Sequence, residues 1–266
     1  MFFATPGFLT PTQTPAATYL LDIYSGAAAA YSVRKLSSTT TNSMRVRRSS
    51  DNSEQDIGFV GSDLDTASLL SFVGANDGFV TTWYDQSGNG YNATQATAGN
   101  QPQIVSSGAV ITDNGKPAID WGTVGNSKSL FNLAVDISHK SSFSVINYDG
   151  TNPFTQYYGV LTYNYTANED LSILTNNAST TWYIGLHGHN GGVPTNTALP
   201  TILNQTLLFD AINSAPNRTN IYIGIDRALA SRGWQGKIQE VIIYNTDQTA
   251  NRTAIESNIN TYFEVY

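Results

Sequence analysis

Short β-type segments separated by turn residues run along most of this chain, and no other feature of the sequence constrains the fold as strongly. Residues 103–105, 109–111 and 117–121 are strand-like and are divided by Ser-Ser-Gly and Asn-Gly-Lys. Strands that recur about every 8–12 residues, with turns between them, are typical of a β-sandwich. The second half continues the pattern, so we predict an all-β fold, a two-sheet antiparallel jelly-roll sandwich.

Two helices are expected to interrupt the strands. A short internal helix is predicted over residues 63–73, with Asp63 or Asp65 as its N-cap. A C-terminal helix is predicted after Thr246 or Asp247, because apolar residues then recur at helical spacing up to the end of the chain.

Two strands are distinctive. Residues 43–48 alternate apolar side chains with Arg45 and Arg47, as in an antiparallel strand with one face in water, and we expect local pairing with the acidic residues of 51–56 rather than a polyanion site. Residues 238–244 are apolar on both faces except at Gln239 and Glu240, which indicates a central strand.

Composition narrows the class of protein. The chain has 266 residues, a net charge of −7, 12% charged residues and no cysteine. The negative charge argues against nucleic acid or an anionic membrane as partner, and the missing cysteines exclude disulfides and thiolate metal sites. The length fits one domain, which we place at residues 19–266.

Residues 1–18 are rich in Pro, Thr and Phe and show no periodicity, which favours an extended N-terminal arm. Its alternatives are a frayed terminus and an anchor that docks into a neighbouring subunit. The apolar side chains that would anchor it are Phe2, Phe3, Phe8 and Leu9.

Turn residues and polar side chains are densest in the stretch from Trp83 to Asn92. Glycines within it allow the chain to fold back tightly, and it presents Asp85, Asn89 and Asn92. Oxygens of Asp and Asn are the ligands that Ca²⁺ prefers, so these three residues are a candidate calcium site. The alternative is a hydrogen-bonded corner. No other cofactor is expected.

A glycine-rich segment around residue 188 is the candidate carbohydrate site. Sugars are bound by aromatic faces that stack on C–H groups and by polar groups that bond hydroxyls. The residues that could do this are Trp182, Tyr183, His187, His189 and Asn190. As metal ligands the two histidines form a weak signal, because no carboxylate is near them in the sequence.

Several stretches together resemble a known family. Leu21-Asp22-Ile23-Tyr24, residues 31–36, residues 46–51 and Trp83-Tyr84-Asp85-Gln86-Ser87-Gly88-Asn89-Gly90 resemble the catalytic domain of family 54 α-L-arabinofuranosidases and are also similar to domains of bacteriophage virion proteins. Residues 236–244 and the following helix resemble the end of a concanavalin A-like lectin/glucanase domain. The resemblance covers most of residues 19–125 and 234–263, and implies a concanavalin A-like jelly roll.

The departures from that family bear on activity. The family builds its sugar pocket partly from a vicinal cysteine pair, and this chain has no cysteine. Its middle carboxylates, Glu169, Asp170, Asp210 and Asp226, stand in no context that matches the family's catalytic motifs. We therefore assign no catalytic residue, and we expect Asp226 to pair with its neighbour Arg227.

From these features we predict a bacteriophage virion component, a capsid or tail appendage that binds host-surface carbohydrate without catalysis. Its expected partners are other virion proteins, reached through the arm, a host glycan and further copies of the chain. One alternative is an arabinofuranosidase-like glycoside hydrolase. A second is a purely structural decoration protein without a ligand.

Overall fold

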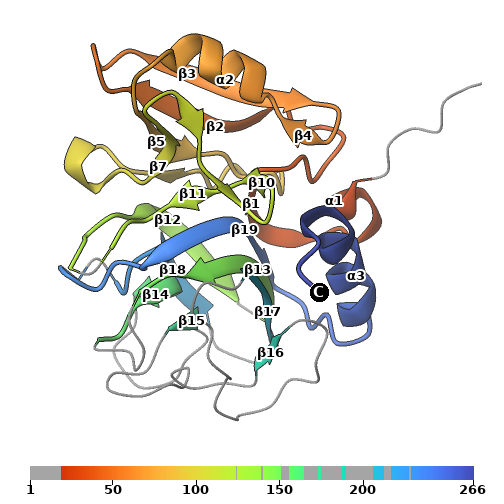
Figure 1. Ribbon diagram of the computed structural model, residues 1–266. Helices are drawn as coiled ribbons and strands as arrows, with labels where there is room; N and C mark the ends of the chain where they lie inside the picture. Colours follow the sequence, from red (N-terminus) through yellow and green to blue (C-terminus); the bar gives the residue numbers. More distant parts are fainter. Residues whose placement is uncertain are drawn as a thin grey trace, which may run out of the picture.

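The structure is a computed structural model that describes residues 19–123, 125–138, 140–150, 156–164, 173–174, 187–189, 206–212, 217–227 and 229–266 (Figure 1). The arm residues Phe2, Phe3, Phe8 and Leu9 lie outside the described residues. Within the described part, no helix is long and apolar enough to cross a membrane.

Seventeen strands form one continuous, strongly curled sheet, and β5 (Gly78–Trp83) is the point where it divides. The start of β5 pairs with β7, and its end pairs with β6. On its other edge β5 pairs with β2 (Asn42–Arg48). Next to β2 lie β3 (Glu54–Val60) and then β4 (Asp63–Leu64), at the top of Figure 1.

Two branches lead away from β5. The first comprises β7 (Gln103–Ser106) with β8 (Ala109–Val110), β11 (Ile119–Asp120), β19 (Gly236–Tyr244), β13 (Ser141–Tyr148), β17 (Thr206–Ile212) and β16 (His187–His189), and β1 (Ala27–Ser32) joins it beside β19. The second comprises β6 (Ala93–Thr94), β12 (Leu130–Ser138), β18 (Asn217–Ile223), β14 (Gly159–Asn164) and β15 (Ile173–Leu174).

One hydrophobic core joins the two branches. Its cluster of buried side chains includes Val145 and Val241 of the first branch and Leu161 and Ile223 of the second. Every strand pair within the sheet is antiparallel. The predicted all-β sandwich is therefore confirmed.

The alanine run at residues 27–30 forms strand β1 and not a helix. All four side chains are buried, because β19 pairs with one edge of β1 and the stretch from Trp83 to Asn92 bonds to the other. Backbone groups that pair on both sides outweigh the helix propensity of alanine.

Strand β19 is central, as predicted, and an irregular step in its pairing explains its two polar residues. Val145 of β13 faces Glu240, whereas Ile146 faces Ile238, so Gln239 is an extra residue. Gln239 donates to the carbonyls of the hairpin formed by β9 (Thr112–Asp113) and β10 (Lys116–Pro117), and Glu240 binds Arg34.

The internal helix α2 (Thr66–Val73) ends as predicted but starts later than residue 63, because Asp63–Leu64 form β4 and Asp65, one of the two predicted residues, is the N-cap. The Asp65 carboxylate accepts a hydrogen bond from the Ser68 amide, and Gly74 ends the helix. The C-terminal helix α3 (Arg252–Phe263) covers the first branch at the right of Figure 1, but its predicted cap is wrong. Asn251 stands at its N-cap, while Asp247 accepts from the Thr249 amide in the preceding turn.

Two further short elements complete the described chain. Helix α1 (Leu20–Ile23) lies near α3, and the 3₁₀ turn η1 (Ala98–Asn100) precedes β7. Two arginines of β2 pair locally as predicted, since Arg45 binds Asp56 at 2.7 Å and Arg48 binds Asp51 at 2.7 Å. Arg47 instead donates to the side chains of Gln101 and Asn52.

Candidate functional site

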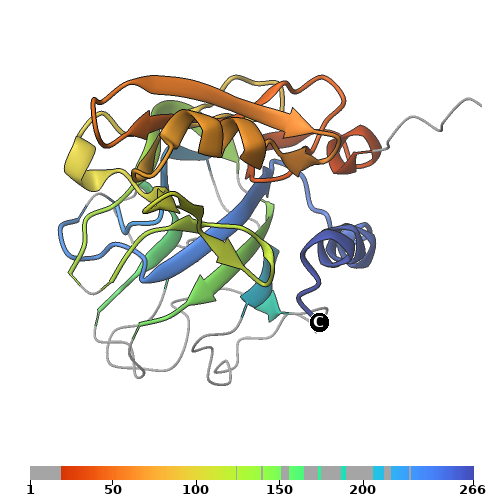
Figure 2. The same ribbon diagram turned by 45° about the horizontal axis from the view of Figure 1, so that its top comes forward.

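Several loops meet at the end of the sandwich where β11, β13 and β18 terminate, at the left of Figures 1 and 2. The amide of Asp149 donates to the carbonyl of Gln235 at 3.1 Å, and that of Gly233 donates to Asn126 at 3.2 Å. We call this region the rim and define it as residues 120–123, 125–128, 147–150, 157–159, 224–227 and 229–237.

A buried carboxylate lies in the rim just after β18. Asp226 is 1% exposed and forms ion pairs with Arg227 at 2.6 Å and with Arg232 at 2.7 Å. The Thr162 hydroxyl holds the same turn, since it donates to the Ile225 carbonyl and accepts from the Arg227 amide. The predicted pairing of Asp226 with Arg227 is confirmed, and Arg232 is a second partner that lies farther along the chain.

Glycine at position 224 allows the two branches to meet at the rim. Its φ is +75°, and a Cβ added there would lie 1.5 Å from Nε1 of Trp121. Trp121 is fully buried, and its indole N–H has no hydrogen-bond partner among the described residues. No other residue type fits at position 224 without moving the ring.

Gln235 is a second buried polar group of the rim. Its side chain is fully buried, and neither its amide oxygen nor its amide nitrogen has a partner among the described residues. Its Oε1 lies close to the backbone of Gly150, where an added Cβ would come within 2.1 Å. Buried amides are normally paired, so Gln235 is a group whose hydrogen bonds a ligand could complete.

Charged side chains of the rim have shifted pKa values. Burial raises the pKa of the Asp149 carboxyl; Lys237 at 3.5 Å opposes this shift, and the charge of Asp120 adds to it. Burial also lowers the pKa of Lys128, against the attraction of Asp120. Groups whose protonation is shifted in this way are common at catalytic sites.

The rim thus combines a carboxyl whose pKa is raised by burial and a buried ion-paired carboxylate above a cluster of buried aromatic rings. Tyr148 packs against Trp234 with ring centroids 5.3 Å apart, and against Tyr158 at 6.3 Å. Two carboxyl groups in different environments can divide the roles of proton donor and negative charge. Sequence reasoning missed Asp149 and Gln235; the only available signal was a carboxylate and a glycine directly after a strand.

The stretch from Trp83 to Asn92 forms a hydrogen-bonded corner. The Asp85 carboxylate accepts from the amides of Ala30, Ser87 and Tyr91 at 2.9–3.0 Å and from the Ser87 hydroxyl at 2.7 Å. The side-chain amide of Asn89 donates to the carbonyls of Ala27 and Ala28, and the side-chain oxygen of Asn92 accepts from the backbone amide of Asp85.

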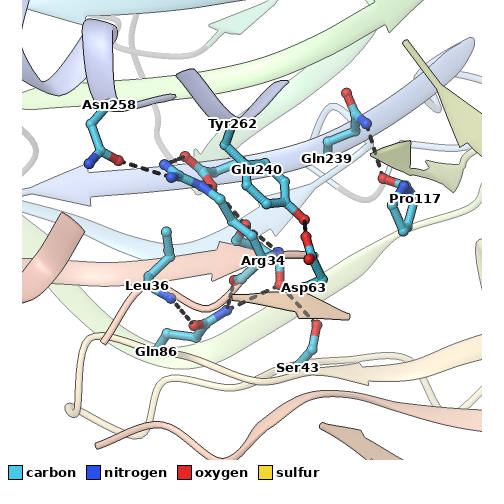
Figure 3. Close-up of polar contacts among 11 residues, drawn as sticks. Arg34, Leu36, Ser43, Asp63, Gln86, Pro117, Gln239, Glu240, Asn258 and Tyr262 are labelled. Carbon is cyan, nitrogen blue, oxygen red and sulfur yellow. Dashed lines mark hydrogen bonds and ion pairs between the residues drawn. The ribbon is translucent and has the colours of Figure 1, made fainter. Parts of the chain in front are cut away.

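Gln86 ties this corner to the segment that follows β1. Its side chain accepts from the Leu36 amide at 2.8 Å and donates to the carbonyls of Ser32 and Arg34 (Figure 3). These bonds connect the corner to β1 and to the segment that follows it. Calcium at Asp85, Asn89 and Asn92 stays a prediction, and the described residues contain no group of three His, Cys, Asp or Glu side chains that could hold a metal.

The predicted carbohydrate residues Trp182, Tyr183 and Asn190 lie outside the described residues. His187 and His189 belong to β16, whose backbone pairs with β17, and their side chains are not among those described. The role of these five residues in carbohydrate binding stays a prediction.

Comparison with known proteins identifies relatives of the chain. A family profile described as "Alpha-L-arabinofuranosidase B, catalytic" matches residues 21–168. Among curated proteins, no match was found.

Solved structures share the fold. They include a GH54 α-L-arabinofuranosidase soaked with a cyclic sulfate inhibitor, an arabinofuranosidase complexed with arabinofuranosyl-α-1,2-xylobiose, and a Glu-to-Gln mutant soaked with 4-nitrophenyl α-L-arabinofuranoside. Each is 19% identical with a TM-score of 0.58, and the match covers 88% of this chain and 62% of the other. The chain thus spans less than two thirds of these proteins.

The family match corrects one prediction from the sequence. The main hypothesis, a virion structural protein with non-catalytic glycan binding, is wrong, because the matching family and the similar structures are those of a glycoside hydrolase. Some of the matching stretches also resemble phage domains, and the chain lacks the cysteine pair of the enzyme family. For these two reasons the enzyme was the alternative prediction and not the main one.

Proposed function

The chain belongs to the family of α-L-arabinofuranosidase B catalytic domains, and on this basis we propose that it is a glycoside hydrolase that removes α-L-arabinofuranosyl groups from a carbohydrate. The match to the family profile over residues 21–168 is the observation that carries the proposal. The rim supplies the groups that such a reaction needs.

Glycoside hydrolysis requires a carboxylic acid that protonates the leaving oxygen. Asp149 fits this part, because burial raises the pKa of its carboxyl, and a raised pKa is what a proton donor needs. Its backbone is fixed by the hydrogen bond to Gln235 and by the end of β13, so the carboxyl projects from a rigid element.

The reaction also requires a second carboxylate that attacks the sugar or activates water. Asp226 is the buried carboxylate of the rim, and two arginines set its orientation. Gln235, Tyr158 and Trp234 are fully buried beneath these carboxylates and support the rim from within. The chain lacks the cysteine pair of the resembling family.

Release of 4-nitrophenol from 4-nitrophenyl α-L-arabinofuranoside tests the proposal. Loss of a positioned proton donor lowers kcat/KM by about 10²–10⁴-fold, which is the effect we expect for Asp149→Asn. In the native protein we expect kcat/KM to fall as pH rises through the raised pKa of Asp149, and this limb should be absent in the variant.

Two matched controls separate chemistry from folding. Asp51→Asn removes an exposed ion-paired carboxylate outside the rim, and Glu256→Gln removes a buried one in α3. Both should retain turnover, whereas Asp226→Asn should lose it while the protein stays folded by circular dichroism. Absence of turnover in the folded native protein refutes the proposed function; full turnover in both rim variants refutes the assignment of Asp149 and Asp226.

A further inference from the structure

The corner carries a pocket that shares no residue with the rim. Its volume is about 230 Å³, and it is lined by residues 39–42, Tyr84, Asp85, Gly88 and Asn92. Sites for drug-sized ligands measure roughly 300–1,000 Å³, so this pocket has room for one small ring rather than a larger group.

The lining excludes charged ligands. No lysine or arginine lines the pocket, so an anion would find no counter-charge. Asp85 is its one acidic residue, and both of its carboxylate oxygens already accept hydrogen bonds from N–H or O–H donors of the corner. A cation would have to displace these donors.

Neutral polar groups remain available. Within the described part of the chain, the side chains of Thr40, Thr41 and Asn42 form no hydrogen bond, although each carries a donor and an acceptor. The side-chain oxygen of Asn92 accepts from the backbone amide of Asp85, and the side-chain N–H groups of Asn92 have no acceptor among the described residues. Hydroxyls and amides in such an arrangement match the alternating donors and acceptors of a sugar.

The aromatic side of the pocket is held in place. The Tyr84 hydroxyl donates to Asp56 at 2.7 Å, and Asp56 in turn binds Arg45 through two bonds of 2.7 and 2.9 Å. A ring fixed by its own hydroxyl keeps its face in one position, which reduces the entropy lost when a ligand stacks on it.

From this geometry we propose that the corner pocket is a second carbohydrate-binding site, one that takes a single neutral sugar residue through Thr40, Thr41, Asn42 and Tyr84. The site holds carbohydrate without acting on it, because its only carboxylate is occupied by the protein. It is independent of the proposed hydrolysis, and a protein without turnover could still bind sugar here.

NMR titration of the ¹⁵N-labelled full chain tests this proposal, with L-arabinose and xylobiose as neutral probes and galacturonic acid as the charged one. We expect saturable shifts of the amides of residues 39–42, Tyr84 and Asn92 with a neutral probe, and at least about fivefold weaker binding of galacturonic acid. One hydrogen bond to a neutral group corresponds to about a fivefold change in Kd, which we expect for Asn42→Ala.

Variants at position 84 distinguish stacking from damage to the fold. Tyr84→Phe keeps the ring but loses the hydroxyl that fixes it, so its binding should lie between that of the native protein and that of Tyr84→Ala, which should bind at least about fivefold more weakly. The Asp149→Asn variant should bind at the corner like the native protein. Shifts that fail to saturate, shifts confined to the rim, or equal binding of galacturonic acid would each overturn the proposal.

Discussion

Replacement of Glu240 by glutamine tests the ion pair that joins β1, β19 and α3. The Glu240 side chain is fully buried and accepts from Ser32 Oγ at 2.7 Å, Arg34 Nε at 2.7 Å and Arg34 NH2 at 3.0 Å (Figure 3). The Arg34 side chain is 7% exposed, and its other hydrogen bond goes to Asn258 of α3.

The expected loss of stability follows from this geometry. Glu240→Gln leaves the guanidinium charge buried with only neutral partners, and its amide N–H₂ would face the N–H groups of Arg34. Removal of one partner of a buried pair costs about 3–5 kcal/mol. For a protein of this size, about 1 kcal/mol lowers Tm by roughly 2–4 °C, so we expect Tm to fall by roughly 6–20 °C.

Urea unfolding followed by tryptophan fluorescence measures this loss, because Trp83, Trp121 and Trp234 are fully buried. The exposed pair provides the control: Asp56→Asn should change the free energy of unfolding by about 1 kcal/mol or less. The double variant Arg34→Met/Glu240→Leu should regain most of the stability, since it leaves no unpaired charge. A loss below about 1 kcal/mol for Glu240→Gln would refute the reasoning.

Three further outcomes are expected. In urea unfolding, Gly224→Ala should lower the free energy of unfolding by about 4 kcal/mol or more, because its methyl group would overlap the Trp121 ring. The control Gly99→Ala places its methyl group where no atom lies within 4 Å, so it should change this free energy by about 0.5 kcal/mol or less. The folded state binds the Asp149 proton more tightly than the unfolded state, so the contribution of this group to stability falls as pH rises from the ordinary to the raised pKa. Over this range the native protein should lose stability relative to Asp149→Asn. If the difference in the free energy of unfolding between the two proteins does not change with pH, the shift is contradicted. If protein donors alone hold Asp85, EDTA should leave Tm within about 1 °C, and a larger drop would instead support the predicted calcium site.

Local sequence patterns predicted much of the fold. Alternation and turn spacing indicated the sandwich, Asp65 and Gly74 marked the ends of α2, and the apolar run at 238–244 indicated a central strand. Caps and turns depend on interactions between residues that are close in the chain. The buried faces of strands can be read from the order of apolar and polar residues. The strand formed by the alanines of β1 is not encoded locally, because their partners lie more than 50 residues away in the chain.

The candidate sites depended on tertiary structure. Sequence alone determined that the stretch from Trp83 to Asn92 turns tightly and is polar, and that Asp226 sits beside an arginine. Only the folded chain decided that the Asp85 oxygens face protein donors, that Arg232 joins Arg227 on Asp226, and that Gln235 is buried without a partner. The physical reason is that desolvation and hydrogen-bond satisfaction depend on groups brought together from distant parts of the chain, which spacing along the sequence does not encode.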